Sequence, residues 1–356
     1  MTATASPAPG SVNGQRSYPS YGHPLWRRLL LRRESAIIAL LVGVIVVASA
    51  AVPHFAAPIT YNFLLLDMAP VLLIALPMTL VIITGEIDLS VASAMGLASS
   101  IIGLLTQSHW PFPAAAGVAL AVGAVGGAVN GILITRVGLP SLAVTIGTLA
   151  LYRGIAQGLL GTTAVTSFPA FWTDLATSTL PGTLIPSVTV LIVVLALLFG
   201  VVLHFTPFGR GIYAIGLSSD AAAFSGVKIQ RTKFLLFVLA GLVSALAGIF
   251  YTLRFGSARG DNATGLELSV IAAVLLGGVS IFGGRGALVG VLAGALLIGV
   301  LASALRLAGI TSDVINVITG TLLVLSVILS SFLDWLQRMR ASAGRRRREA
   351  KVPASS

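Results

Sequence analysis

Long apolar runs alternate with short polar segments from residue 36 to residue 335. A helix needs about 20 mostly apolar residues to cross the hydrocarbon core of a bilayer. Ten runs reach or approach this length, and they occupy residues 36–52, 61–83, 89–106, 113–134, 141–161, 186–205, 233–253, 268–283, 287–307 and 313–333. The pattern therefore predicts an all-α polytopic membrane protein with about ten transmembrane helices. The eighth run is the weakest, because it is short and Gly277 and Gly278 interrupt it.

Two basic segments flank the predicted membrane domain of residues 36–335. Residues 1–35 begin with a stretch rich in Ser, Pro, Gly and Ala that is typical of a disordered tail, and residues 336–356 form a second basic tail. The basic N-terminal stretch, the first apolar run and Ala48-Ser49-Ala50 also suit a signal peptide with its cleavage site. We favour an uncleaved first span, because the preceding tail is long and an even set of spans requires it. Sequencing the mature N-terminus distinguishes the two.

Small residues recur at helix-packing spacing in many of the runs. The fourth run contains Gly123, Gly126, Gly127 and Gly131. In lipid, small residues at an interface let two helix backbones approach closely. The sequence therefore predicts a tightly packed helical bundle.

The positions of lysine and arginine predict the orientation. Short cytoplasmic loops carry an excess of these residues. If the N-terminus is cytoplasmic and the runs alternate, 18 of the 22 Lys and Arg residues fall on the inner side. Both termini are therefore predicted to be cytoplasmic, and the run Arg345 to Arg348 is expected to lie beside anionic lipid. A nucleic-acid partner is not expected despite the net charge of +11, because no soluble domain could present a basic face.

Composition narrows the chemistry further. Hydrophobic residues make up 56% of the chain and charged residues only 9%, far from the balance of a soluble globular protein. The chain has no cysteine, which excludes disulfides, thiol nucleophiles and thiolate metal sites. Its four histidines are far apart, without metal-ligand spacing. The glycine-rich segment 283–288 lacks the Lys-Ser/Thr ending of a phosphate-binding loop and is expected to form a tight inner turn. If ATP drives transport, another chain must hydrolyse it.

The stretch from Thr84 to Val91 carries two carboxylates, Glu86 and Asp88, between two apolar runs. One interpretation is a solvated loop at the membrane surface. The other is a structured break in the helices that faces a polar pathway or a subunit contact, because ionisable groups inside membranes are rare and usually functional.

The longest inner connection, residues 206–233, is predicted to contain a short helix. Ser218 or Ser219 can cap its start, Asp220 suits its first turn, and Gly226 can end it. This helix either only connects two spans or docks into a groove of a cytoplasmic partner. On the outer side, the polar and aromatic segments 162–185 and 254–267 suit an interfacial helix and an exposed loop, and either segment could also dock an external protein.

Three ordered motifs resemble one family. Thr84 to Ser93, reading TGEIDLSVAS, resembles the "TGGIDLSVGS" signature of permease subunits in bacterial ribose-type ABC importers. The segment from Asn130 to Gly154, with Asn130-Gly131, PSLAVTIGT and Arg153-Gly154, is similar to the family's "NG … PPFIVTLGT … RG". Tyr213 to Gly226 is similar to its "YAIGGN…AA…SGI" loop. Glu86, Ala92 and the stretch 217–220 depart from the family pattern and look like the rhamnose or autoinducer branch, which leaves the sugar open.

The resemblance implies a multi-pass permease of the bacterial inner membrane that pairs with a second, identical or different, permease. A cytoplasmic ATPase would bind the ATP, so this chain would need no cofactor and would not be an enzyme. A periplasmic binding protein would deliver a monosaccharide such as ribose or rhamnose. On this view the 206–233 loop couples to the ATPase through Gly216, Asp220, Ala221, Ala222, Ser225 and Gly226. The translocation path or permease contact would involve Thr84, Gly85, Glu86, Asp88, Ser90, Ser93, Thr145 and Thr148, although hydroxyl groups also serve in helix packing.

Two other functions stay open from the residues alone. Glu86 and Asp88 could carry protons or sodium at a broken helix of a secondary transporter. An intramembrane enzyme is the weaker alternative, because the sequence offers no paired histidines, no cysteine and no serine with an evident base. Transport that stops on ATP depletion separates the importer from the ion-coupled transporter.

Overall fold

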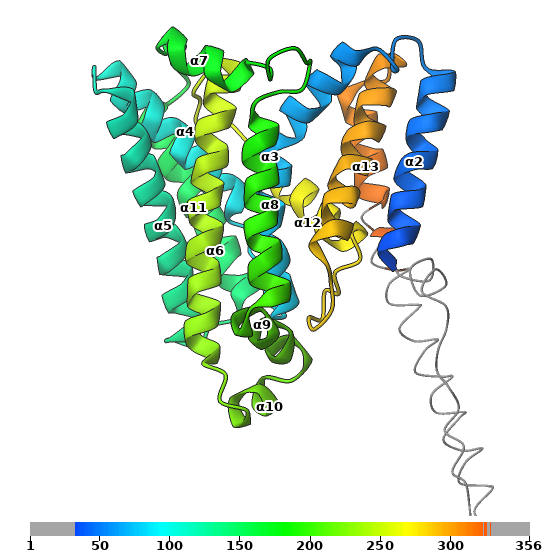
Figure 1. Cartoon of the computed structure of the whole chain (residues 1–356). Helices are drawn as coiled ribbons and strands as arrows, with labels where there is room; N and C mark the ends of the chain where they lie inside the picture. Colours follow the sequence, from blue (N-terminus) through cyan, green and yellow to red (C-terminus); the bar gives the residue numbers. More distant parts are fainter. Residues whose placement is uncertain (1–32, 323, 326–327, 329–356) are drawn as a thin grey trace, which may run out of the picture.

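The computed structural model describes residues 33–322, 324–325 and 328 of the 356-residue chain (Figure 1). Most of the predicted tail 1–35, the whole predicted tail 336–356 and its arginine run Arg345 to Arg348 lie outside these residues. The named elements are all helices: α2 (Arg33–Ala51), α3 (Pro58–Ile83), α4 (Val91–Gln107), α5 (Phe112–Thr135), α6 (Ser141–Leu160), α7 (Ala170–Thr177), α8 (Val188–Phe205), α9 (Pro207–Leu217), α10 (Ser219–Phe224), α11 (Ile229–Phe255), α12 (Leu266–Leu276) and α13 (Leu288–Leu307).

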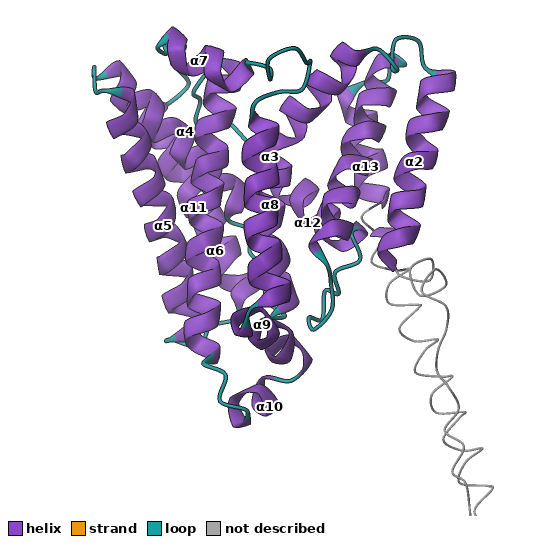
Figure 2. Cartoon of the chain, in the orientation of Figure 1, coloured by secondary structure: helices purple, strands orange, loops and turns teal. Residues whose placement is uncertain are grey.

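The helices confirm an all-α membrane protein (Figure 2). Within the described residues, six helices are long and apolar enough to cross a membrane, namely α3, α5, α6, α8, α11 and α13. Three shorter apolar helices are also found among the described residues: Ser35–Ala51 within α2, α4 and α12. The tenth predicted run begins as helix at residues 312–322, and part of it lies outside the described residues. The count of about ten spans therefore stays a prediction.

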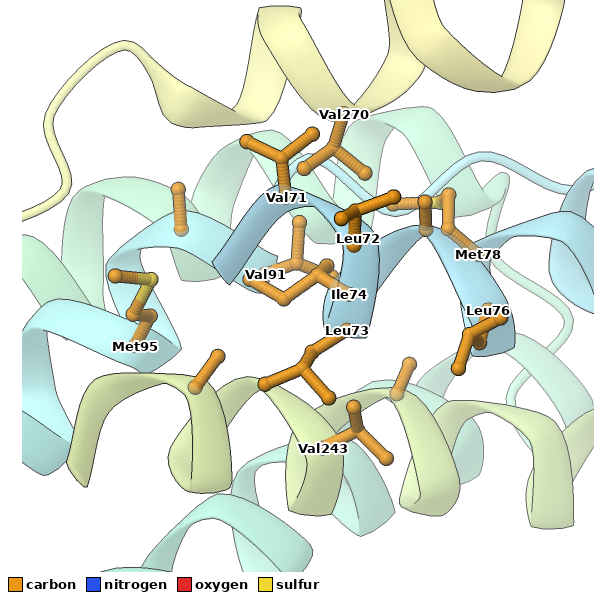
Figure 3. Close-up of a cluster of buried hydrophobic side chains, with 14 of the residues drawn as sticks. Val71, Leu72, Leu73, Ile74, Leu76, Met78, Val91, Met95, Val243 and Val270 are labelled. Carbon is orange, nitrogen blue, oxygen red and sulfur yellow. The ribbon is translucent and has the colours of Figure 1, made fainter. Parts of the chain in front are cut away.

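Helix α3 lies at the centre of the bundle. It is apolar on all sides, which is typical of a buried helix. Figure 3 shows side chains of residues 71–78 meeting Val91 and Met95 of α4, Val243 of α11 and Val270 of α12. The segment that follows α3 therefore starts from the interior of the protein.

Helices α5 and α11 pack through glycines, as the spacing in the fourth run predicts. A Cβ atom built on Gly127 would lie 2.2 Å from the carbonyl oxygen of Phe237. A Cβ atom built on Gly241 would lie 2.2 Å from the carbonyl oxygen of Gly123. Neither position tolerates a side chain unless the helices separate, so the small-residue prediction is confirmed for this pair.

We expect Gly127→Val to destabilise the protein, because the new side chain meets backbone atoms of α11 that cannot rotate away. Overpacking of this kind costs roughly 1–3 kcal/mol. The measurement is the apparent melting temperature in detergent. Gly117→Val in the same helix is the control, since a Cβ atom there meets nothing within 4 Å among the described residues. Equal melting temperatures for the two variants would contradict the proposed α5–α11 contact.

Helix α12 corrects the predicted eighth span. The sequence pattern placed a span at residues 268–283, but α12 covers only Leu266–Leu276 and ends at Gly277. Eleven residues at about 1.5 Å each cover roughly half of the hydrocarbon core. The loop 256–265, which precedes α12, enters the bundle and reaches α4. There a Cβ atom on Gly96 would lie 2.7 Å from the carbonyl oxygen of Asn262. Irregular backbone at such depth requires burial in protein or a water-filled cavity.

The bundle has two distinct ends (Figure 1). Helix α11 starts beside α10 and reaches α7 at its other end, so we call these the α10 end and the α7 end. Of the ten Lys and Arg residues between the start of α3 and the end of α13, six lie at or near the α10 end: Arg136, Arg210, Lys228, Arg231, Lys233 and Arg285. The α7 half contains four: Arg153, Arg254, Arg259 and Arg306. The α10 end therefore matches the side that the charge pattern predicts to be cytoplasmic.

Candidate functional site

The acidic stretch forms a structured break between α3 and α4. Asp88 is only 2% exposed, and its Oδ1 accepts hydrogen bonds from the Ser90 backbone N–H at 2.9 Å and from the Ser90 hydroxyl at 2.6 Å. The Thr84 hydroxyl donates to the carbonyl oxygen of Val81 at 2.7 Å. Gly85 is exposed and Glu86 half-buried. Asp88 and Ser90 thus lie inside the protein, not in a solvated surface loop.

Helices α5 and α6 form hydrogen bonds with this break. The Asn130 amide donates to the Ser90 hydroxyl at 2.8 Å. The Ile87 backbone N–H donates to the Ser141 hydroxyl at 3.3 Å, and the Thr145 hydroxyl donates to the Ile87 carbonyl at 3.2 Å. Segments that lie 40 to 58 residues apart in the sequence therefore meet at one place. Asn130 and Ser141 were not among the predicted site residues, although both lie in the motifs.

The hydroxyl groups predicted to line a path are engaged in packing. Ser93, Thr145 and Thr148 are buried. The Ser93 hydroxyl donates to the Ser90 carbonyl at 2.8 Å, and the Thr148 hydroxyl donates to the Val144 carbonyl at 3.1 Å. Ser93 thus bonds to the end of the break and Thr145 to Ile87 within it, whereas Thr148 bonds within α6, so a lining role stays a prediction.

Glu86 links the break to α11. Its carboxylate forms an ion pair with the Lys233 ammonium, and both side chains are less than one-fifth exposed. Removing one partner of a buried pair usually costs more than the pair contributes, because the other charge is left uncompensated. This pairing could not be predicted from the sequence, since 147 residues separate the two.

A second break meets the first. The loop 277–287 follows α12, and its Gly284 N–H donates to the Ile83 carbonyl at 2.8 Å. Helix α9 packs on the same junction: the Tyr213 hydroxyl donates to the Gly286 carbonyl at 2.7 Å. A Cβ atom on Gly216 would lie 1.9 Å from the carbonyl oxygen of Ile83 and 2.3 Å from the Gly284 nitrogen. Glycine at 216 is therefore required for α9 to contact both breaks at once.

The predicted short helix of the 206–233 loop is confirmed as α10. The Ser218 hydroxyl accepts from the Ala221 N–H at 3.3 Å at its start, and Gly226 follows its end with a φ of +80°. The sequence interpretation missed α9. The signal was present, because the Thr206 hydroxyl caps α9 and Pro207 occupies its first position, as helix starts commonly do.

The residues predicted to couple to an ATPase divide into two sets. Asp220, Ala221, Ser225 and Gly226 are exposed at the tip of the α10 end, together with Phe224, which is 94% exposed. Ala222 is 2% exposed and Gly216 is half-buried, so these two support the loop from inside. Phe224 and Leu217, which is 68% exposed, are large apolar side chains that this loop presents at its surface, and contact with an ATPase stays a prediction.

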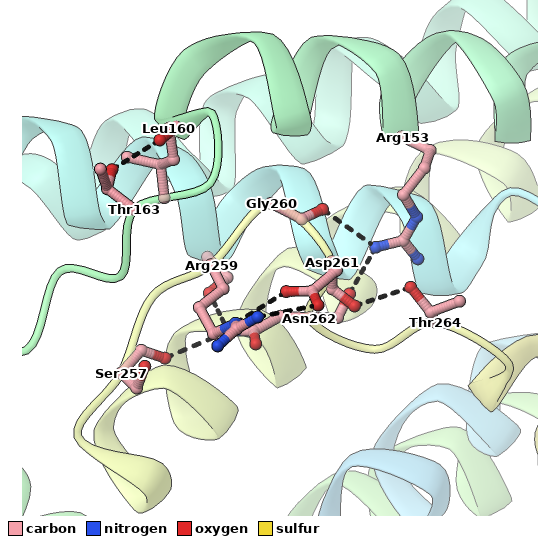
Figure 4. A network of polar contacts seen from close by, with 10 residues as sticks. Arg153, Leu160, Thr163, Ser257, Arg259, Gly260, Asp261, Asn262 and Thr264 are labelled. Carbon is pink, nitrogen blue, oxygen red and sulfur yellow. Dashed lines mark hydrogen bonds and ion pairs between the residues drawn. The ribbon is translucent and has the colours of Figure 1, made fainter.

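A polar network anchors the loop 256–265 at the α7 end (Figure 4). Arg153 of α6 donates to the carbonyl oxygens of Asn262 at 2.5 Å and Gly260 at 3.3 Å. Arg259 donates from Nε and Nη2 to the two carboxylate oxygens of Asp261 at 2.9 and 3.2 Å. These hydrogen bonds lower the pKa of Asp261, so the carboxylate stays ionised at neutral pH. Arg153 thus gains a clear structural role that the motif alone did not reveal.

The outer segment 162–185 contains a short helix, as expected, and its location at the membrane interface stays a prediction. Helix α7 carries Phe171, Trp172 and Asp174, and the Trp172 ring stacks on Phe112 of α5 with ring centroids 5.1 Å apart. Contact with an external protein stays a prediction for this segment.

Comparisons with known proteins agree with these features. Residues 60–327 match the family described as the branched-chain amino acid transport system / permease component. A protein of Photorhabdus laumondii described as an autoinducer 2 import system permease is 36% identical over 323 residues, which cover 86% of this chain and 96% of that protein. The corresponding permease of Yersinia enterocolitica is 36% identical over 281 residues, with 75% and 84% coverage. That of Photorhabdus temperata is 34% identical over 323 residues, with 86% and 96% coverage.

Proposed function

The chain belongs to the branched-chain amino acid transport system / permease component family, and we propose that it is one of two permeases in an importer that a separate cytoplasmic ATPase drives. It is a multi-pass membrane protein of the bacterial inner membrane and a permease component of a sugar-type ABC importer. We further propose that a cytoplasmic ATPase, a second permease and a periplasmic binding protein that delivers the cargo complete this importer.

The shape of the α10 end carries the ATPase proposal. Helix α10 is the outermost described element at this end, and its Phe224 ring is almost fully exposed (Figure 1). An exposed apolar side chain on a short helix fits a groove on a partner protein. The basic residues around it support a cytoplasmic location for this end, where ATP is available.

The cargo follows from the relatives. The named relatives import autoinducer 2, and the motif departures at Glu86 and Ala92 point to the same branch. We therefore propose autoinducer 2 or a closely related sugar as the cargo, with ribose and rhamnose as the alternatives that the motifs allow.

The ion-coupled alternative loses its support at the break. Asp88 accepts two hydrogen bonds from Ser90, and Glu86 is paired with Lys233. A residue that carries protons or sodium through a transport cycle must exchange its partner with the cargo ion, and both carboxylates already hold structural partners. The chain's membership in a family of permease components points the same way.

The coupling proposal follows from the packing of α9. A movement of α10 on the ATPase would move α9, and α9 is in contact with both breaks through Gly216 and Tyr213. The breaks end α3 and α12 and precede α4 and α13. Displacing them would tilt four helices of the bundle together, which is the kind of change that alternating access requires.

We expect Phe224→Ala to weaken association with the ATPase by roughly tenfold or more, because truncation of a buried aromatic anchor commonly costs 2 kcal/mol or more. The measurement is the amount of ATPase that co-purifies with the tagged permease. Phe171→Ala is the control, since this phenylalanine is 69% exposed at the opposite end. Undiminished ATPase recovery with Phe224→Ala would remove α10 as the docking helix.

A further inference from the structure

A polar cleft lies at the α7 end between the end of α6 and the loop 256–265. Its volume is about 380 Å³, within the range of small-molecule pockets. It is lined by Gln157, Gly161, Thr162, Thr163, Arg259, Gly260 and Asp261. None of these residues was among the predicted path residues, and none belongs to the break between α3 and α4.

The charged rim of the cleft is preorganised. Arg259 and Asp261 form a bidentate pair, yet their side chains are 53% and 57% exposed. The two hydrogen bonds orient the guanidinium and the carboxylate relative to each other, and their exposure leaves further hydrogen-bonding positions accessible at the cleft that they line. A carboxylate accepts from hydroxyl groups and a guanidinium donates to them, so the pair presents both functions to one ligand.

The floor of the cleft is rigid. Arg153 fixes the Gly260 and Asn262 carbonyls, and a Cβ atom on Gly260 would lie 2.7 Å from the Gln157 Cα. Backbone hydrogen bonds of 3.0 and 2.8 Å join Val165 to Ala258. The loop is thus tied to α6 by Arg153 and by the close approach of Gly260 to Gln157, and to the segment after α6 by Val165, so it is expected to keep its shape when a small ligand arrives.

The cleft opens beside an uncovered face of α6. Gln157 is exposed, and a Cβ atom on either Gly154 or Gly158 would meet nothing within 4 Å among the described residues. In the importer proposed above, the path runs between two permeases. A polar cleft at the outer end of an uncovered helix face lies where such a path would begin.

We propose that this cleft is the entry subsite of the translocation path and binds a polyhydroxylated, sugar-like molecule through Arg259, Asp261 and Gln157. The Gln157 amide can donate to one hydroxyl and accept from the next, while the charged pair engages neighbouring hydroxyls. The exposed, solvated pair suits brief occupancy, which a path needs so that cargo is released onward. The proposal rests on the proposed function, and it adds the subsite to it. A docking surface for the binding protein is the competing use, but the concave shape favours a small molecule.

The natural absence of cysteine makes a direct test possible. Gln157→Cys places one thiol in this chain, and the assembled importer with its ATPase, second permease and binding protein is treated with a maleimide during ATP turnover. Autoinducer 2, D-ribose and L-rhamnose are the probes, and mass spectrometry of this chain measures the modified fraction. We expect one of these sugars to slow modification by roughly fivefold to tenfold, as occupancy near saturation requires. Thr183→Cys, an exposed position at the same end, should be unaffected.

Two outcomes would overturn the subsite. No protection by any of the three sugars would do so, and so would equal protection by the binding protein without sugar, which would indicate a docking surface. As a second measurement, Asp261→Asn should reduce cargo uptake per ATP hydrolysed while leaving the affinity of the binding protein for the complex unchanged. A weakened binding-protein affinity with normal uptake per ATP would contradict the proposal. The unaltered importer must first show ATP-dependent uptake; its failure there would reject the proposed function instead of the cleft.

Discussion

Replacing Gly216 with valine is expected to reduce ATP-driven uptake strongly. The new Cβ atom would lie 1.9 Å from the Ile83 carbonyl oxygen and 2.3 Å from the Gly284 nitrogen, and both are backbone atoms that cannot move aside alone. Helix α9 must then withdraw from the junction of the two breaks. We expect uptake to fall by roughly tenfold or more, since overpacking against fixed backbone costs about 1–3 kcal/mol. The measurement is uptake into vesicles that contain the assembled importer.

Measuring ATPase binding and uptake separately identifies the cause of the defect. Gly216→Val should keep the ATPase bound, because the exposed surface of α10 is unchanged, but ATP hydrolysis should no longer produce uptake. Gly200→Val in α8 is the control, since a Cβ atom there meets nothing within 4 Å among the described residues. Normal uptake by Gly216→Val would rule out α9 as the element that transmits ATPase movement to the breaks.

The second large effect is expected from Asp88→Ala. The buried carboxylate accepts from the Ser90 N–H and hydroxyl, and the Ser90 hydroxyl also accepts from Asn130. Each buried donor left without a partner costs about 1–3 kcal/mol. The variant should therefore lower both the melting temperature and the uptake rate, because the start of α4 loses its support. Thermal unfolding in detergent and vesicle uptake measure the two effects.

Asp88→Asn separates hydrogen bonding from charge. The asparagine oxygen can still accept from Ser90, so a structural role predicts substantial recovery of both stability and uptake. A role in carrying protons would need the ionisable carboxylate, and Asn would then be as inactive as Ala. Equal loss of uptake in the two variants, with normal stability of Asp88→Asn, would contradict the structural role of Asp88.

Much of the fold follows from the positions and lengths of the apolar runs, and the errors in the predicted spans have physical causes. A run such as residues 61–83 is long and uniformly apolar, so the position of α3 is predictable to within a few residues. The prediction of a span at residues 268–283 was wrong because hydropathy does not indicate where a helix ends. Gly278, with a φ of +88°, and the return of loop 256–265 into the bundle depend on tertiary contacts that residue counting cannot detect.

The site was predictable only in outline. The motifs identified Asp88, Ser90 and Thr145, and the structure brings these together with Asn130 and Ser141. Pairings across long distances were not predictable, because nothing in a single sequence links Glu86 to Lys233 or Gly216 to Ile83. The cleft at the α7 end was not predicted for the same reason, because Gln157 and Asp261 become neighbours only after the loop folds back on α6.

Cargo uptake into vesicles tests whether this permease belongs to an ATP-driven importer. The permease is reconstituted with its ATPase, second permease and binding protein, and labelled autoinducer 2 is supplied on the side of the binding protein. We expect uptake that requires ATP on the opposite side, stops when ATP is depleted and is unaffected by collapse of the proton and sodium gradients. Uptake that persists without ATP and follows an ion gradient would contradict it.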